Sequence, residues 1–360
     1  MRKRALVYVY YLIFGGKSPQ PEAITLFLTH RCNLRCKMCG QWGESGVTKK
    51  QTSQYVVKEL DLEVFKGLID SVASFRPSIT LFGGEPLLYA RCMDLVRHIK
   101  EKKMHCLMIT NGSLLDRYGA DLVDAGLDEL NISLDGARDL HDEIRGMPGL
   151  YDKITGGIKE VNKIKKNRGK KKPLINLQCT ITRYNYRNLD QMLTVAEDTE
   201  ADSLTFHNLI FLGRDLLEKQ MKFDRLLGSS SLDWEGFIFE PGIEPDVLYN
   251  KISDIMSRHR RFSVDFYPNL SMNGLKEYYT KESYLPREYR PLCLSPWMTC
   301  YVFPDGEVRP CLNSTYSFGN ITQTDLKHIW NSEAAVRFRK ILKERGIFPV
   351  CVRCTELYRY

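Results

Sequence analysis

The chain has 360 residues, of which 43% are hydrophobic and 27% are charged, so it is long enough to bury a full-sized core without disulfide support. This composition excludes collagen-like, mucin-like and polytopic membrane proteins. Lys and Arg exceed Asp and Glu by a formal net charge of +8, which favours an anionic partner such as a phosphate, a membrane surface or nucleic acid.

The chain begins with the basic residues Arg2, Lys3 and Arg4, followed by an apolar run over 5–14. A signal peptide starts in the same way, but no small-residue cleavage site follows, and the run is too short to span a bilayer. Thiolate ligands directly downstream need a reducing compartment. We therefore predict a cytoplasmic protein whose N-terminus packs on the domain or makes peripheral contact with a membrane through aromatic residues beside Arg and Lys.

From Ala23 onward, apolar strand-like runs alternate with stretches of helical period, which predicts a parallel sheet with crossover helices. The predicted strands are 24–28, 78–82, 106–110, 129–134, 174–180 and 203–207. The predicted helices are 62–74, 89–101, 116–125, 151–166 and 187–197. Six such units predict a partial barrel or an open α/β sheet.

The remaining third of the chain is less regular, with a predicted helix over 245–258 and a strand over 262–266. Residues 301–309 then predict a hairpin with an Asp-Gly turn, and a helix follows over 332–344. We expect an N-terminal extension (1–20), a core (21–212), a connecting region that shapes the substrate pocket (213–290) and a small cysteine-bearing α+β domain (291–360).

Several motifs directly follow predicted strands, and loops at the carboxyl ends of parallel strands converge on one face. These motifs are the cysteine run 32–39, the Gly-Gly-Glu-Pro turn 83–86, Asn-Gly-Ser 111–113, Asp-Gly 135–136 and Thr-Arg-Tyr-Asn 182–185. The basic run 163–172 precedes a strand instead. It is expected on the far side as a solvated loop, away from any chemistry.

The chain has eleven cysteines, and eight of them fall in two tight sets at opposite ends, which is typical of metal ligation. The first set, Cys32, Cys36 and Cys39, places three thiolates close enough to hold one cubane-sized cluster. Three ligands leave one metal position open to an exogenous molecule; a zinc site that borrows His30 is the alternative. The singletons Cys92, Cys106 and Cys179 are predicted to be core residues.

The spacing CxxxCxxC after a first strand, together with Gly83-Gly84-Glu85-Pro86 one unit later, resembles the radical S-adenosylmethionine (SAM) superfamily. The resemblance implies a partial (β/α)6 TIM-like barrel in which the first three cysteines hold a 4Fe-4S cluster. It also implies that the amino and carboxylate groups of SAM chelate the fourth iron, and that reduction cleaves SAM to a 5'-deoxyadenosyl radical. By this resemblance the Gly-Gly-Glu segment contacts the SAM amino group.

Three further assignments come from the same resemblance. Ser133 and Asp135 are similar to residues that contact the SAM ribose, and Arg145 is expected to pair with the SAM carboxylate. The residue before the third cysteine is frequently aromatic in this family, whereas here it is Met38, which can still cover an adenine edge.

The C-terminal set resembles a single-cluster SPASM or twitch-type extension of radical SAM enzymes. The resemblance implies that four thiolates hold an auxiliary 4Fe-4S cluster with no open iron: Cys293, Cys311, Cys351 and Cys354. A zinc ribbon is the alternative, because paired CxxC elements serve zinc equally well. Cys300 is surplus to four ligands, and it is a packing residue, an alternative ligand or a hydrogen-atom donor.

The resemblance implies an oxidoreductase that abstracts hydrogen from a small or carrier-linked substrate, with the auxiliary cluster accepting an electron. The candidates for a base or binding group are His207 at the end of the sixth strand and Asp265 in the later strand. A reducing donor such as flavodoxin or ferredoxin is expected. Epimerisation, and C-C or C-S bond formation in a peptide, are the alternative reactions. A peptide substrate is less favoured, because only about twenty residues precede the first strand.

Two hypotheses outside this class of oxidoreductase remain. The first is a metal-stabilised scaffold that binds an anionic partner and cleaves no SAM. The second is RNA modification; its weakness is that the basic run lies on the wrong face and lacks interleaved aromatic residues, so a nucleic acid partner is not expected.

Overall fold

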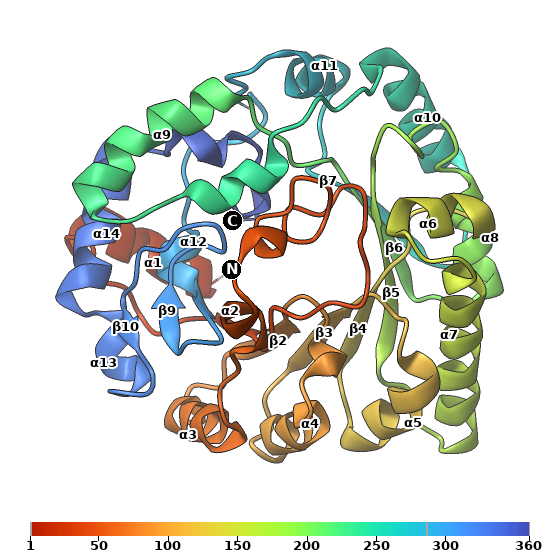
Figure 1. Ribbon diagram of the computed structural model, residues 1–360, viewed down its shortest axis with the longest axis horizontal. Coiled ribbons are helices and arrows are strands. Elements are labelled where there is room, and N and C mark those ends of the chain that lie inside the picture. Colours follow the sequence, from red (N-terminus) through yellow and green to blue (C-terminus); the bar gives the residue numbers. More distant parts are fainter. Residues whose placement is uncertain (1, 286, 360) are drawn as a thin grey trace.

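The computed structural model describes residues 2–285 and 287–359, and its strands form one curved sheet. Within the described residues the strand order is β10-β9-β8-β1-β2-β3-β4-β5-β6-β7. Strands β1 to β7 are parallel in sequential order. Figure 1 shows them curving into part of a barrel, with the crossover helices on the outside. The predicted partial-barrel α/β fold is confirmed.

The strands have the bounds β1 Ala23–Phe27, β2 Ser78–Phe82, β3 Cys106–Thr110, β4 Glu129–Ser133, β5 Leu174–Thr180, β6 Ser203–His207, β7 Ser263–Tyr267, β8 Thr299–Val302, β9 Glu307–Arg309 and β10 Gly319–Asn320. All six predicted βα strands are present. The run predicted over 262–266 is β7, which pairs in parallel with β6 and extends the barrel beyond six units.

The crossover helices are α3 Leu62–Val72, α4 Cys92–Glu101, α5 Leu115–Ala125, α7 Leu150–Asn167 and α8 Gln191–Asp198. Two of them begin three to four residues later than predicted. Before α4, a 3-10 turn (η2, Pro86–Leu88) takes up the chain. Before α8, residues 182–188 form turns in which Asn185 accepts hydrogen bonds from Thr182.

The other helices are α1 Arg2–Ile13, α2 Ser53–Val57, α6 Arg138–Arg145, α9 Arg214–Leu227, α10 Pro245–Ser257, α11 Met272–Thr280, α12 Ser295–Met298, α13 Leu326–Trp330 and α14 Glu333–Arg345. Short 3-10 helices are η1 Thr48–Lys50, η3 Leu232–Phe237, η4 Pro349–Arg353 and η5 Thr355–Tyr358. In the described part of the chain, no helix is both long enough and apolar enough to cross a membrane.

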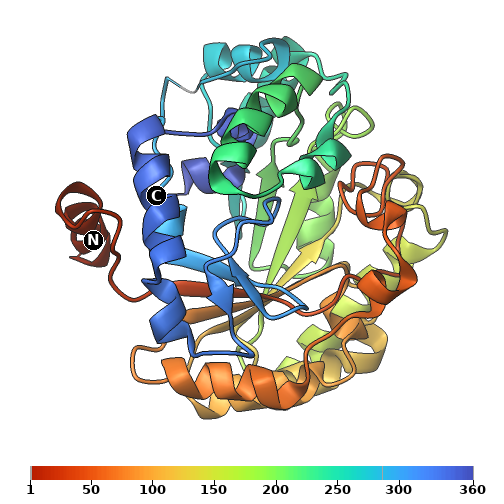
Figure 2. The same cartoon turned by 60° about the vertical axis from the view of Figure 1, so that its left-hand side comes forward.

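The C-terminal region continues the sheet of the core. Strand β8 pairs in parallel with β1, and β9 returns antiparallel to β8, so the predicted hairpin is present. Its turn requires glycine, because Gly306 has φ +86° and a Cβ there would lie 2.4 Å from the side-chain oxygen of Asn320. The hairpin therefore lies beside the first strand of the barrel (Figure 2).

The basic run 163–172 covers the last residues of α7 and the loop before β5, at the amino-terminal ends of the strands. Lys165 is buried and donates to the carbonyl oxygen of Pro173 at 2.8 Å. Lys172 forms an ion pair of 2.6 Å with the buried Asp128. These contacts give the run a packing role at the end of the barrel opposite the cysteine run and the other motifs that follow the strands.

Candidate active site

The first cysteine set lies in the loop that follows β1. Backbone N–H groups point at two of its sulfurs: Leu34 N lies 3.5 Å from the Cys32 sulfur, and Trp42 N lies 3.3 Å from the Cys39 sulfur. Helix α6 supports the loop from behind, because Lys37 N donates to the carbonyl of Ile144 at 2.9 Å. These contacts fix the conformation of the loop, so that all three thiols lie within one short segment.

The Gly-Gly-Glu-Pro turn packs directly against the start of this loop. Gly83 has φ +155°, and a Cβ there would lie 2.6 Å from the Thr29 carbonyl oxygen; a Cβ on Gly84 would lie 2.3 Å from that of Arg31. The backbone N–H groups of Gly84 and Glu85 donate to the same two carbonyls, at 2.8 Å each. Only glycine allows the two segments to approach this closely.

The side chain of Glu85 is fully buried beneath the turn. One carboxylate oxygen accepts from the Thr110 hydroxyl (2.7 Å) and from Leu87 N (3.2 Å), and the other accepts from Asn111 N (2.8 Å). Burial raises the pKa of Glu85 to about 7, although these three donors act to lower it. In this structure the carboxyl group therefore ties the turn to the end of β3.

Amide side chains connect the cysteine loop to the same strand end. Asn111 donates to the Asn33 side-chain oxygen at 2.9 Å, and Asn33 donates to the Ser113 hydroxyl at 2.8 Å. Asn111 also lies 3.9 Å from the Cys32 sulfur. The structure thus brings together three of the motifs that were expected to meet at the carboxyl ends of the strands.

Asp135 and Arg145, both expected to contact SAM, bind each other. The Arg145 Nε donates to an Asp135 oxygen at 2.6 Å, and the other oxygen accepts from Thr180 N at 2.8 Å. Burial alone would lower the pKa of Arg145, but the adjacent Asp135 carboxylate raises it. Arg145 also reaches the Cys36 sulfur at 3.7 Å. The pair therefore links the end of β4 to the cysteine loop.

Ser133 and Met38 are both partly exposed on this side of the barrel. Ser133 is the last residue of β4 and pairs with Gln178 of β5. Met38 packs against the main core beside Cys39. The structure thus leaves both residues near the cysteine loop and the strand ends.

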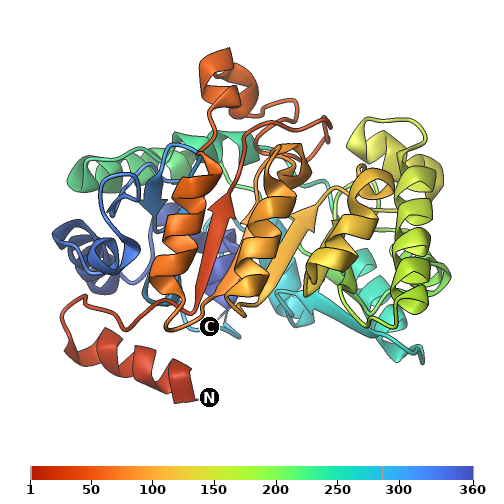
Figure 3. The same cartoon turned by 90° about the horizontal axis from the view of Figure 1, so that it is seen from below.

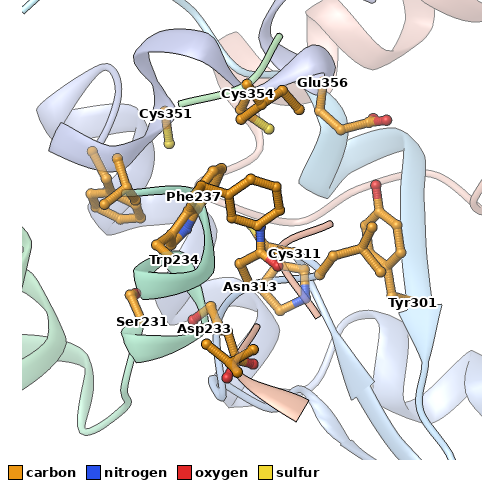
Figure 4. Close-up of a pocket in the computed structure, with 18 of the residues that line it drawn as sticks. Ser231, Asp233, Trp234, Phe237, Tyr301, Cys311, Asn313, Cys351, Cys354 and Glu356 are labelled. Carbon is orange, nitrogen blue, oxygen red and sulfur yellow. The ribbon is translucent and has the colours of Figure 1, made fainter. Parts of the chain in front are cut away.

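The four C-terminal cysteines lie together around one cavity, although they come from three separate segments. Cys293 precedes α12, Cys311 follows β9, and Cys351 and Cys354 lie at η4. Burial and the other three thiols raise the pKa of Cys293 well above its usual value, which reflects their mutual proximity. Figure 4 shows Cys351 and Cys354 on one wall and Cys311 across from them. By its chemistry such a set of soft donors fits an iron-sulfur cluster.

The cavity has a volume of about 300 Å³ and extends from these cysteines to the segment that follows Cys39. Gly40 and Gln41 line its far side. Its walls are largely apolar, and the aromatic residues among them include Phe27, Phe82, Phe303, Tyr55, Tyr301, Trp234 and Phe237. The cavity therefore lies between the C-terminal cysteines and the segment that directly follows the first cysteine set.

The short helix η3 forms the bridge between the two sets. Gly236 lies so close to Gly40 that a Cβ on Gly236 would be 2.0 Å from the Gly40 carbonyl oxygen. On its other side, Trp234 and Phe237 pack in a cluster with Val350 and Val352 around Cys354. This short 3-10 helix thus contacts both the first cysteine loop and the C-terminal region.

Asp233 and Tyr55 are cavity residues that the sequence patterns did not indicate. Within the described residues, no hydrogen-bond partner is found for the Asp233 carboxylate or for the Tyr55 hydroxyl. Burial raises the pKa of Asp233, although the nearby positive charge of Arg309 acts to lower it. Burial, and to a smaller extent the negative charge of Asp233, raise the pKa of Tyr55 to about 12. A 3-10 helix has no long periodicity, so no pattern signal was available to find Asp233.

The three residues proposed from sequence as catalytic candidates lie outside the lining of this cavity. His207 bonds through Nε2 to Gln178 at 2.5 Å, and burial lowers its pKa to about 4. Asp265 is exposed on the edge strand β7. Cys300 is fully buried in the core on β8, and burial raises the pKa of its thiol to about 12. None of the three shares a contact with the two cysteine sets in the described residues.

Among the described residues, no group of three or more His, Cys, Asp or Glu side chains is arranged to hold a single metal ion.

Two family profiles match the two cysteine-bearing parts of the chain. The Radical SAM superfamily profile matches residues 26–178, and a profile for the SPASM iron-sulfur cluster-binding domain matches residues 293–355. Together they cover more than half of the chain. The chain belongs to the radical SAM superfamily. It is a radical SAM enzyme with a C-terminal SPASM domain, as the cysteine spacing predicted.

Relatives of this radical SAM protein include enzymes named for cofactor synthesis. The AdoMet-dependent heme synthase of Methanosarcina barkeri is 26% identical, over 93% of this chain and 88% of its own. A tungsten-containing aldehyde ferredoxin oxidoreductase cofactor-modifying protein of Pyrococcus furiosus is 25% identical, over 92% and 86%. The Fe-coproporphyrin III synthase of Methanosarcina barkeri is 32% identical, but over only 57% of this chain and 48% of its own, so this chain spans about half of that relative.

Solved structures share the fold. Streptococcus suis SuiB bound to S-adenosylmethionine aligns with a TM-score of 0.66 at 15% identity, over 94% of this chain and 72% of its own. The native anSMEcpe structure with bound AdoMet and the Cp18Cys peptide aligns with a TM-score of 0.58 at 18% identity, over 94% and 88%. At these identities the likeness concerns the fold alone.

Proposed function

We propose that this radical SAM enzyme oxidises a small or carrier-linked metabolite and passes one electron to an auxiliary cluster in its SPASM domain. The observation that carries the proposal is the shared cavity: the four C-terminal cysteines and the segment after Cys39 line the same space. A substrate bound there lies between the two cysteine sets. This arrangement suits hydrogen abstraction on one side and electron acceptance on the other.

The thiols of each set are the proposed ligands. Cys32, Cys36 and Cys39 hold the 4Fe-4S cluster that binds SAM, and the four C-terminal cysteines hold a second one with every iron ligated. Four soft donors from three segments fit such a cluster, and the N–H groups directed at the Cys32 and Cys39 sulfurs favour the thiolate form. When bound, the first cluster and SAM supply a 5'-deoxyadenosyl radical, and the second supplies an electron acceptor.

The residues proposed to position SAM surround the first set. The backbone of Gly83, Gly84 and Glu85 lies against the cysteine loop and is proposed to receive the SAM amino group. Ser133 is proposed to contact the ribose, and Met38 the adenine edge. The Asp135 and Arg145 pair is proposed to act together, because Asp135 orients the guanidinium toward the loop while Arg145 offers its remaining N–H groups to the SAM carboxylate.

Oxidation of a substrate radical also requires a base, and we assign this role to Asp233. Its carboxylate faces the cavity between the two cysteine sets and, among the described residues, accepts no hydrogen bond. It can therefore take the proton that leaves the substrate as the electron departs. The earlier candidates, His207 and Asp265, do not line the cavity, and the buried Cys300 is placed to pack rather than to donate hydrogen.

The names of the relatives support a small-molecule substrate. Heme synthases and an Fe-coproporphyrin III synthase act in the formation of iron porphyrins, so porphyrins are the first class of substrate to test. The aromatic walls of the cavity suit a flat conjugated ligand. A low-potential donor such as flavodoxin or ferredoxin is proposed as the reductant.

The proposal is tested by counting iron and sulfide in the anaerobically purified parent and in the Cys32→Ala/Cys36→Ala/Cys39→Ala variant. Two independent 4Fe-4S clusters predict about eight irons in the parent and about four in the variant. If the variant instead holds zinc and no iron, the SPASM domain is structural and the reaction is redox-neutral. A parent that releases no 5'-deoxyadenosine from SAM with a strong reductant contradicts the radical function itself.

A further inference from the structure

The N-terminal helix α1 stands apart from the rest of the molecule. Figures 2 and 3 show it beside the body, beyond the C-terminal helices and at the end of the barrel opposite the cysteine loop. It is followed by the tight turn Gly15-Gly16, in which both residues have positive φ. After this turn the chain is anchored, because the Ser18 hydroxyl donates to the carbonyl of Trp297 at 2.7 Å.

One side of α1 contacts the protein. Val7 is buried, and the Tyr11 ring packs edge-on against Trp297 with 5.1 Å between the ring centroids. Lys343 of α14 donates to the Leu12 carbonyl at 2.9 Å, and Arg290 donates to the Tyr8 hydroxyl at 3.0 Å. These contacts fix which side of the helix faces away from the protein.

The outward side is apolar. The helix exposes four large hydrophobic side chains, Leu6, Val9, Leu12 and Ile13, each between 42% and 71%, and Phe14 directly after it is 46% exposed. Leu6, Val9 and Ile13 follow the i, i+3, i+7 spacing of one helix face. A contiguous exposed apolar patch of this kind marks a surface that binds a membrane or another molecule.

The charges around the patch indicate what covers it. The first 21 residues of the chain contain four basic and no acidic residues. Arg4 is exposed, and Lys17, Lys340 and Lys343 lie around the C-terminal end of the helix, with Lys340 next to Gly15 and Gly16. Glu288 lies near the other end, in the depression beside Arg4 and Tyr8. A second copy of this face would bring like charges together, whereas an anionic lipid surface would attract them.

We propose that α1 lies in the headgroup region of an anionic membrane and holds the enzyme at its surface. The exposed apolar residues enter the interface, and the surrounding lysine and arginine side chains meet the lipid phosphates. Because α1 lies at the end of the barrel opposite the cysteine loop (Figure 3), the docked protein keeps the carboxyl ends of its strands in water.

The test is co-sedimentation of the full anaerobically purified chain with vesicles of phosphatidylcholine, alone or with phosphatidylglycerol. We expect binding to the anionic vesicles that falls as salt is raised. The variant Leu6→Glu/Ile13→Glu should bind at least about tenfold more weakly, since two carboxylates then face the lipid. The matched control Met221→Glu/Met256→Glu changes two exposed apolar residues on other helices and should bind as the parent does.

Three results overturn the proposal. The first is that the parent does not bind anionic vesicles. The second is that the variant Leu6→Glu/Ile13→Glu binds them as well as the parent does. The third is that light scattering shows a dimer which these substitutions dissociate, because a second copy of the chain then covers the face. The iron content and the release of 5'-deoxyadenosine should be unchanged in the α1 variant, so failure here is distinct from failure of the proposed reaction.

Discussion

Asp233 lines the cavity between the C-terminal cysteines and the segment after Cys39, and its carboxylate is proposed to remove the substrate proton. Asn at this position keeps the shape and loses the basic oxygen. For Asp233→Asn we expect product formation to fall by about 100-fold. SAM cleavage to 5'-deoxyadenosine should continue, because the change leaves the first cysteine loop intact. The measurement is the ratio of oxidised product to 5'-deoxyadenosine, with the porphyrin class as the first substrates.

The control for this change is Asp265→Asn. Asp265 is exposed on β7 and does not line the cavity, so both activities should stay at the parental level. If instead Asp265→Asn lowers the ratio of oxidised product to 5'-deoxyadenosine and Asp233→Asn does not, the base is Asp265 on β7 and not Asp233.

His207 gives a prediction for pH dependence. Burial lowers its pKa to about 4, from about 6.5 in an unfolded chain. Between these two values the unfolded state binds more protons than the folded state, so folding stability falls as pH falls from about 6.5 to 4. His207→Gln removes this titration while keeping a group that can donate to Gln178. We expect the melting temperature of the variant to fall less than that of the parent between pH 7 and pH 5.

His30 and His141 are buried, and burial lowers the pKa of each to about 4. The melting temperature of the variant will therefore still fall somewhat as pH falls from 7 to 5. Identical slopes for the parent and His207→Gln would mean that His207 does not carry a lowered pKa in the folded protein.

At the scale of elements, η3 is the piece that holds the site together. Its Gly236 contacts the backbone of Gly40, so any side chain must displace either η3 or the cysteine loop. We expect Gly236→Ala to lower the free energy of unfolding by about 1 to 3 kcal/mol, the usual cost of overpacking. Chemical denaturation of the purified protein measures this loss.

Gly156→Ala is the matched control in α7. Gly156 is exposed, and a Cβ there would meet nothing within 4 Å, so alanine should stabilise the helix by up to about 1 kcal/mol. Equal effects of the two substitutions would mean that η3 is not packed against the first cysteine loop.

The elements that the sequence predicted are those with a strong local pattern. The strands are short apolar runs, and the amphipathic crossover helices repeat at 3.6 residues, because sheet and helices bury each other. The strand over 262–266 was also predicted, but its pairing with β6 was not, because strand pairing depends on two segments and not on one. Helix η3 was not predicted, because six residues of 3-10 helix are too short to show a repeating pattern of apolar residues.

For the whole molecule, the C-terminal region connects the two edges of the open barrel. At one edge β8 pairs with β1. At the other, the Tyr267 hydroxyl of β7 donates to the Thr355 carbonyl at 2.7 Å, and the buried Arg353 donates to the carbonyl of Tyr278 in α11. The SPASM region is thus part of the core's closure as well as a cysteine-bearing unit.

A chain that ends at residue 290 should therefore fail to fold into a stable protein. It leaves β1 with an unpaired edge and uncovers apolar surface around the barrel opening. We expect aggregation or loss of a cooperative thermal transition. Removal of residues 2–14 is the control, because α1 makes few contacts and its loss should leave the transition nearly unchanged. A cooperative melt of the shortened core would show that the two parts fold independently.

By itself, the sequence determined the class of fold, the two cysteine sets and the superfamily, since periodicity and ligand spacing are local properties that a single segment carries. Only the tertiary structure decided that Arg145 pairs with Asp135, that Cys300 is buried away from the cavity, and that Asp233 faces it. The physical reason is that a cavity, a buried ion pair and a sheet edge exist only between segments. Their partners are set by packing of chains far apart in sequence, which local pattern does not encode.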